Sequence, residues 1–127
     1  MYRAIVFALA LWVCVPAQAH EMTPTYVTFK HSHITGVVKT SLKIFNKRSE
    51  VDYYEIGVFD ESFNPVIFVT PYRVIKIPYL SSTTFDVYIR RSDLASATYI
   101  CSESKLKKSQ TVRTVITSRI CSKIQNG

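Results

Sequence analysis

The sequence predicts an all-β fold: a seven-stranded, antiparallel, immunoglobulin-like sandwich that follows an N-terminal signal peptide. Three observations lead to this prediction. Apolar and polar residues alternate with a period of two in several short segments, as they do in half-buried strands. Turn-forming residues separate these segments, and no helix-period run of useful length follows Ala19. About seven short strands in roughly a hundred residues are typical of an immunoglobulin-like sandwich.

The signal peptide covers residues 1–19 and ends in a small-x-small cleavage site at Ala19. A positively charged residue, Arg3, precedes the apolar core Ile5–Val13. This core is shorter than the about 20 residues that span a bilayer. We therefore expect cleavage after Ala19, a periplasmic or secreted protein, and one domain over residues 20–127.

Segments with strand character follow one another through the rest of the chain, and two of them are short pieces. In chain order they are TYVTFK (25–30), VVKTSLKIFN (37–46), VDYYEIGVFD (51–60), VIFVT (66–70), YRVIKI (72–77), TTFDVYIRR (83–91), TYICSES (98–104) and TVRTVITSRICSKI (111–124). The clearest alternation places three apolar sets on the inner face: Val38, Leu42 and Ile44; Tyr54, Ile56 and Val58; and Phe85, Val87 and Ile89.

Turn signals lie between these segments. The stretches NKRSE (46–50) and ESFNP (61–65) are polar, and the second ends in the strong turn signal Asn-Pro. Pro71 and Pro78 end the two short pieces. The stretch SDLASA (92–97) is a connection in which we expect a brief helical turn.

Charge and composition narrow the range of possible functions and partners. The chain has 16 Lys and Arg against 9 Asp and Glu. Export argues against nucleic acid as the partner, so anionic lipid, polysaccharide or a protein carboxylate remain, unless the charge only solvates the strands. The loop KLKKSQ (105–110) would allow weak contact with an anionic surface. Acidic residues lie scattered at turns and outward positions, without Ser/His/Asp spacing or a glycine-rich loop, so we expect no enzyme.

Two cysteines remain after the signal, because Cys14 lies within it. In an exported protein an oxidised pair is the default. Two thiols are half of a structural zinc set, and no C-x-x-C redox motif is present. The last two strands of such a sandwich are neighbours, so we expect a Cys101–Cys121 disulfide that closes a hairpin.

From Met22 to Ile124 the chain resembles the N-terminal domain of the periplasmic chaperones of the chaperone–usher pilus pathway. The resemblance follows the order of five stretches: TPTYVTF, TSLKIFNKRSEVDYYEIGVFDE, FVTPYRVIKIP, TTFDVYIRR and ATYICSES. It implies a PapD-like immunoglobulin fold. The long-loop branch of the family carries a disulfide between its sixth and seventh strands, where Cys101 and Cys121 lie.

The resemblance also implies how such a protein binds. In the family the seventh strand pairs with an incomplete subunit, and a basic residue on it anchors the subunit's carboxyl terminus. By position the basic residue is Arg119 or Lys123. Three apolar residues at spacings of four, Val112, Ile116 and Ile120, would enter the partner's groove, unless they pack into the protein's own core.

The chain departs from the family in two ways. It ends soon after the seventh strand, without the family's second domain, and its first strand has no basic residue before Lys30. We therefore expect a single-domain variant: an exported, non-enzymatic module, either chaperone-like or an assembly subunit. It would bind a protein subunit or a second copy of itself through an edge strand.

An alternative function follows from the residue after the cleavage site. A terminal His20 would offer its amine and its imidazole to copper(II). His31 and His33 would complete the site, and Met22 would serve copper(I). The alternative prediction is thus a periplasmic copper-binding β-sandwich.

Overall fold

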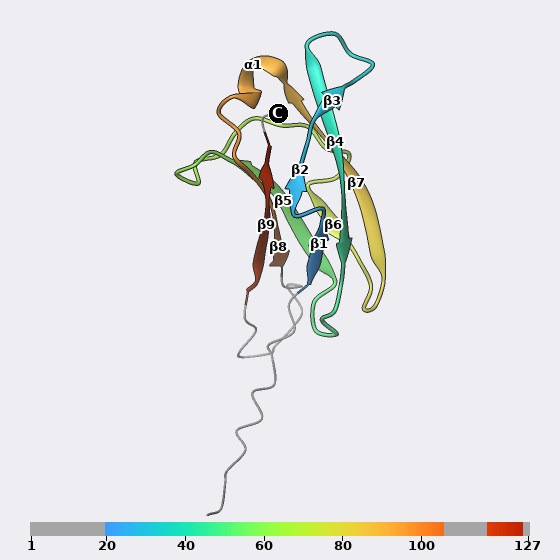
Figure 1. The fold of residues 1–127 in the computed structure, drawn as a ribbon. Helices are drawn as coiled ribbons and strands as arrows, with labels where there is room; N and C mark the ends of the chain where they lie inside the picture. The colour runs from blue at the N-terminus through green and yellow to red at the C-terminus, as the bar shows by residue number, and fades with distance from the viewer. Residues whose placement is uncertain (1–19, 106–116, 126–127) are drawn as a thin grey trace, which may run out of the picture.

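The computed structural model describes residues 20–105 and 117–125, which form two packed β-sheets with one short helix at the end of the sandwich (Figure 1). The elements are β1 (Glu21–Thr23), β2 (Tyr26–Val27), β3 (Lys30–His31), β4 (Val37–Phe45), β5 (Tyr53–Phe59), β6 (Val74–Lys76), β7 (Ser82–Arg90), α1 (Arg91–Leu94), β8 (Tyr99–Lys105) and β9 (Arg119–Ile124). No described helix is long enough to span a membrane.

Each sheet is built around long antiparallel pairs. In the first sheet, β4 pairs with β7 along its whole length, and its other edge holds β1 at one end and β3 at the other. The second sheet has the order β2-β9-β8-β5-β6. The expected immunoglobulin-like sandwich is therefore confirmed.

The first segment of the chain belongs to both sheets. After β1 the chain crosses to the second sheet, where β2 pairs with β9 in parallel, and it then returns to β4 as β3. Met22 and Val27 are buried on the way, so the crossing closes one side of the sandwich. The prediction of one strand over residues 25–30 in a fully antiparallel fold was wrong in this respect, because the segment divides its pairing between two sheets.

The core lies between the sheets, where the alternation placed it. All nine residues of the three predicted inward sets are buried, and the members below are at most 8% exposed. The core consists of Met22, Val27, Val38, Leu42, Ile44, Val51, Tyr54, Ile56, Val58, Phe68, Ile75, Ile77, Phe85, Val87, Ile89, Ala97, Ile100 and Ile124.

The predicted strand over residues 66–70 is absent. Here the chain leaves the edge of β5 and crosses to the first sheet, where Val69 alone bridges Tyr88 of β7. Phe68 is turned into the core, and this crossing prevents a regular ladder. The next short piece is confirmed as β6, and the expected helical turn is α1.

Candidate functional site

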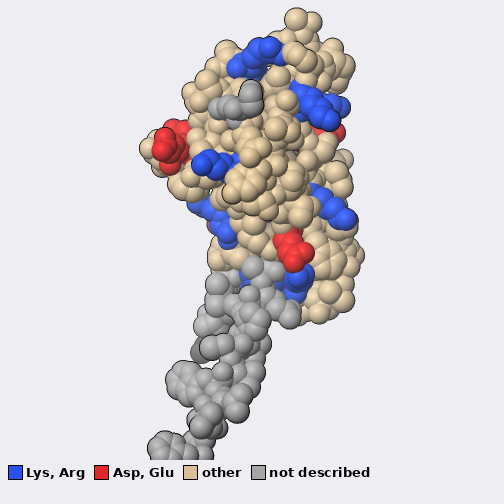
Figure 2. Space-filling view, in the orientation of Figure 1, with Lys and Arg blue, Asp and Glu red and all other residues tan. Residues whose placement is uncertain are grey.

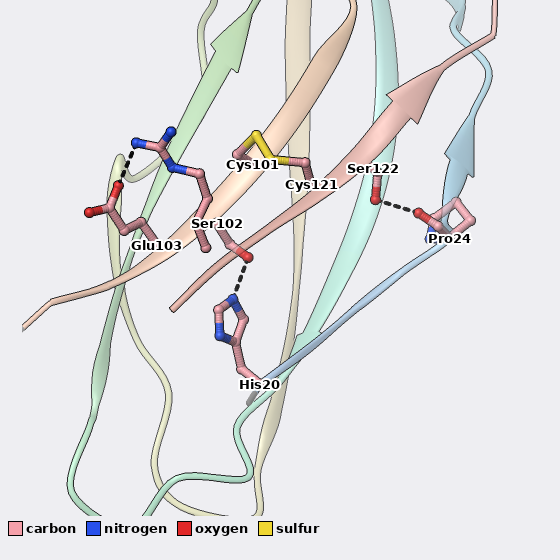
Figure 3. Close-up of a disulfide and its surroundings, with 8 residues drawn as sticks. His20, Pro24, Cys101, Ser102, Glu103, Cys121 and Ser122 are labelled. Carbon is pink, nitrogen blue, oxygen red and sulfur yellow. Dashed lines mark hydrogen bonds and ion pairs between the residues drawn. A yellow bond between two sulfur atoms is a disulfide. The ribbon is translucent and has the colours of Figure 1, made fainter. Parts of the chain in front are cut away.

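The disulfide holds the last strand against its neighbour. Cys101 of β8 lies directly opposite Cys121 of β9, with the two Cα atoms 4.0 Å apart and the sulfur atoms bonded (Figure 3). The pair closes a segment of sequence separation 20. The predicted hairpin disulfide is thus present, and it fixes β9 near the middle of its length.

The two faces of β9 differ in polarity. Arg119, Cys121 and Lys123 face outward, as expected for residues two apart on a strand. Ile120 is half-buried and packs against the protein's own core. Val112 and Ile116, the other two predicted partner-binding residues, lie outside the described residues.

The two predicted cations of β9 have different surroundings. The Arg119 guanidinium lies 3.0 Å from the Glu103 carboxylate across the ladder and 5.4 Å from the centre of the Phe59 ring. Lys123 is exposed and has no acidic partner within residues 20–105 and 117–125. Lys123 is therefore the freer of the two to meet a partner's carboxylate.

The outer edge of β9 is covered only in part. The Lys123 amide donates to the Thr25 carbonyl, and this edge is paired from Lys123 onward by β2. Backbone groups of alternate residues point to the same edge, so those of Arg119 and Cys121 point outward as well. No described strand pairs with that half of the edge.

A buried histidine fastens the start of the first segment beneath β8 and β9. His20 is 1% exposed, and its Nε2 lies 2.7 Å from the Ser102 hydroxyl (Figure 3). Its Nδ1 lies 3.0 Å from the Ser118 hydroxyl, and its ring packs against Tyr54 at 4.5 Å between centroids. The imidazole is thereby enclosed by polar partners on both nitrogens.

Burial keeps this imidazole neutral. Loss of hydration lowers the pKa of His20 to about 4, and the Arg48 charge adds to the effect, while a hydrogen bond to the Ser102 backbone opposes it. At neutral pH one ring nitrogen therefore donates and the other accepts.

A buried arginine extends the same polar cluster. Arg48 is 7% exposed, and its Nη1 lies 3.3 Å from the Ser118 hydroxyl and 3.4 Å from that of Ser104. Its Nε is 2.6 Å from the Glu50 carboxylate, which supplies the counter-charge. The prediction of a polar turn over residues 46–50 did not include this cluster. The signal in the sequence is the serines at inward positions of the last two strands: Ser102, Ser104 and Ser122.

The three histidines of the copper hypothesis have other partners. Both ring nitrogens of His20 are hydrogen-bonded, and an Arg91 nitrogen lies 2.6 Å from Nδ1 of His31. His33 meets the Tyr88 ring edge-on, 6.4 Å between centroids. Across the described ranges, no three His, Cys, Asp or Glu residues are grouped as metal ligands. Copper binding stays a prediction, and at His20 it would require these hydrogen bonds to break.

The positive charge is spread over the surface. On the face drawn in Figure 2, the Lys and Arg side chains lie in separate places and not in one continuous patch. Several Lys and Arg side chains of the described residues are paired with acids, among them Lys47 with Glu21 and Lys105 with Glu55. The loop predicted to touch anionic surfaces lies outside the described residues after Lys105.

Comparison with solved structures identifies the architecture. The E. coli chaperone DraB is similar over 84% of this chain and 53% of its own, with a TM-score of 0.63 and 16% identity. PapD-like domain 7 of human CEP192, an ASH/PapD-like domain, is similar over 98% of this chain and 94% of its own, with a TM-score of 0.54 and 10% identity. No family model and no curated protein sequence matches the chain.

These likenesses show the fold, which is a PapD-like immunoglobulin sandwich. The chain spans about half the length of the solved chaperone. At identities of 16% and 10%, the similarity lies in the path of the backbone. Function on such a fold has to be argued from the site.

Proposed function

We propose that this protein is an exported, non-enzymatic, chaperone-like module that binds an extended segment of a partner protein along the free half of β9. The PapD-like fold, shared with a bacterial chaperone, supports a protein-binding role. The disulfide supports an oxidising compartment, either the periplasm or the exterior. A protein subunit with an extended terminal segment is the partner that this site would suit.

The free half of the β9 edge is the observation that carries the proposal. The ladder from β2 begins at Lys123, and no described strand pairs with the edge-facing backbone groups of Arg119 and Cys121. An exposed edge of this kind is a template for another strand. A partner strand placed here would continue the line of β2 along β9.

The side chains around this edge favour a partner with a carboxylate. Lys123 is exposed beside the end of the free segment, and Arg119 stands on the same face. The disulfide to Cys101 holds β9 in place before the partner arrives, which lowers the entropy lost on binding. In this proposal Lys123 binds the partner's carboxylate, and Arg119, paired with Glu103, forms part of the same outer face.

The experiment compares Arg119→Pro with Arg119→Ala. The Arg119 amide points to the free edge, so proline removes a donor for the partner without removing a bond of the β8–β9 ladder. Alanine removes the same side chain but keeps the amide. Partners are captured from the native compartment by a photo-crosslinker at Thr117 and identified by mass spectrometry.

We expect Arg119→Pro to abolish capture of the partner and Arg119→Ala to retain most of it, with similar melting temperatures. A second pair of variants tests the contribution of the charge. Lys123→Ala should weaken capture, whereas Lys76→Ala, on the opposite edge of the same sheet, should not. Equal capture by the proline and alanine variants would exclude backbone pairing at this edge.

A further inference from the structure

The opposite edge of the second sheet contains a gap in its hydrogen bonding. The segment after β5 folds back along this strand, and the Val66 amide donates to the Val58 carbonyl at 2.9 Å. It then leaves the strand to bridge Tyr88 of the other sheet, and it returns where the Ile56 amide donates to the Arg73 carbonyl at 2.8 Å. Between these two bonds the neighbouring chain is absent from the edge of β5.

Two complementary backbone groups face this gap. The N–H and C=O of a residue in an antiparallel strand point to the same edge. The Val58 N–H therefore points the same way as its bonded C=O, and the Ile56 C=O points the same way as its bonded N–H. No described residue is hydrogen-bonded to either of these two groups. One donor and one acceptor, two residues apart, are thus left open on one edge.

The gap opens into a groove of about 370 Å³. This volume falls within the about 300–1,000 Å³ of typical ligand sites. Its floor is β5, and its far wall is the departing segment with Ile67, Phe68 and Arg73. The Ile67 side chain, which lines the groove, is 69% exposed. The two open backbone groups of β5 therefore lie in a groove with an exposed apolar side chain at its edge.

A single charge is available at the groove. The Arg73 guanidinium lies 4.8 Å from the centre of the Phe68 ring, and the structure records no acidic partner for it among residues 20–105 and 117–125. Glu55, the acid that lines the same groove, is 2.7 Å from the Lys105 ammonium. The groove therefore presents an available cation and a neutralised carboxylate.

We infer that this gap is a second peptide-binding slot, which takes a short extended segment of a partner protein carrying an apolar residue next to an acidic one. In a parallel arrangement one residue, opposite Gly57, would bond both the Ile56 C=O and the Val58 N–H. The apolar side chain would pack on Ile67, and the acidic one would meet Arg73. The slot lies across β8 and β5 from the β9 edge, so it does not depend on the site proposed above.

The probe is a blocked synthetic hexapeptide, acetyl-Thr-Val-Thr-Val-Asp-Thr-amide, at millimolar concentration. Its matched control is the same peptide with every amide N-methylated, which keeps the side chains and removes all backbone donors. The readouts are the amide resonance and hydrogen exchange of Val58 in the full chain, with the Cys121 amide as the reference for the other edge. Ile67→Lys changes the exposed rim, and Arg73→Glu reverses the charge beside the Phe68 ring.

We expect the unmodified peptide to shift the Val58 resonance and to slow its exchange, and the methylated peptide to do neither. Ile67→Lys should weaken the affinity about tenfold, because it removes apolar burial at the rim. No change at Val58, or equal shifts with both peptides, would overturn the inference. So would a Val58 shift that depends on protein concentration without peptide, since the occupant would then be a second copy of the chain.

Discussion

Acidification should remove the contribution that the buried His20 makes to the free energy of unfolding. Above pH 6.5 the imidazole is neutral in both the folded and the unfolded chain, so its hydrogen bonds with Ser102 and Ser118 contribute fully. As the pH falls from 6.5 to about 4, the unfolded chain takes up a proton that the folded chain does not, and the free energy of unfolding decreases. The difference between these pKa values corresponds to about 3 kcal/mol. Below pH 4 both states are protonated and this loss is complete.

The assay is urea unfolding between pH 7 and pH 4, with His20→Gln as the matched variant. Glutamine keeps a hydrogen-bonding side chain but does not titrate in this range. Glu50 loses stabilisation at acid pH in both proteins, because its pKa is lowered chiefly by a hydrogen bond to its own backbone N–H. The difference between the two proteins therefore isolates His20. It should shrink by about 3 kcal/mol toward pH 4, and a difference that stays constant would refute the account of a buried neutral imidazole.

Three further changes test what stabilises the sandwich. Replacing Cys101 and Cys121 with serine should lower the free energy of unfolding by about 3 kcal/mol in urea titrations, since the disulfide closes a segment of separation 20; an unchanged midpoint would contradict this role. Asn46→Ala should cost about 3 kcal/mol by the same measurement, because it removes the side chain that bonds the Val51 and Ile77 carbonyls; a loss below about 1 kcal/mol would mean that water replaces it. Gly57→Ala should lower the melting temperature, because a Cβ atom there would lie 2.7 Å from the Phe59 ring; the effect should disappear in a Phe59→Leu background, and its persistence would place the strain elsewhere.

The alternation of apolar and polar residues predicted most of the strands correctly, because each long strand buries one face. Leu42, Tyr54 and Val87 each lie in the core as their period of two predicts. Where pairing depends on distant partners, the local pattern was insufficient. Residues 25–30 are β-branched and aromatic, yet they divide between two sheets, and this division depends on β9 and β4. Residues 66–70 have the same composition and make a single bridge.

The sequence was sufficient to predict the disulfide of the site and the face of the last strand on which its charged side chains lie. Alternation alone places Arg119 and Lys123 on one face of the last strand. It says nothing of the β2 pairing, which covers the edge at Lys123 and leaves it open at Arg119. The buried Arg48 was hidden because a polar turn and a polar interior have the same composition, and the inward serines distinguish them only once the two sheets are placed together.

Backbone hydrogen exchange at the β9 edge tests the central proposal most directly. The amides of Arg119 and Cys121 are followed in the free protein and in the complex with the partner recovered by crosslinking, with the Lys123 amide, already bonded to the Thr25 carbonyl, as the internal reference. Pairing predicts that the Arg119 and Cys121 amides become protected on binding while the Lys123 amide changes little. If the partner binds and both amides exchange at the rates of the free protein, it does not add a strand to β9.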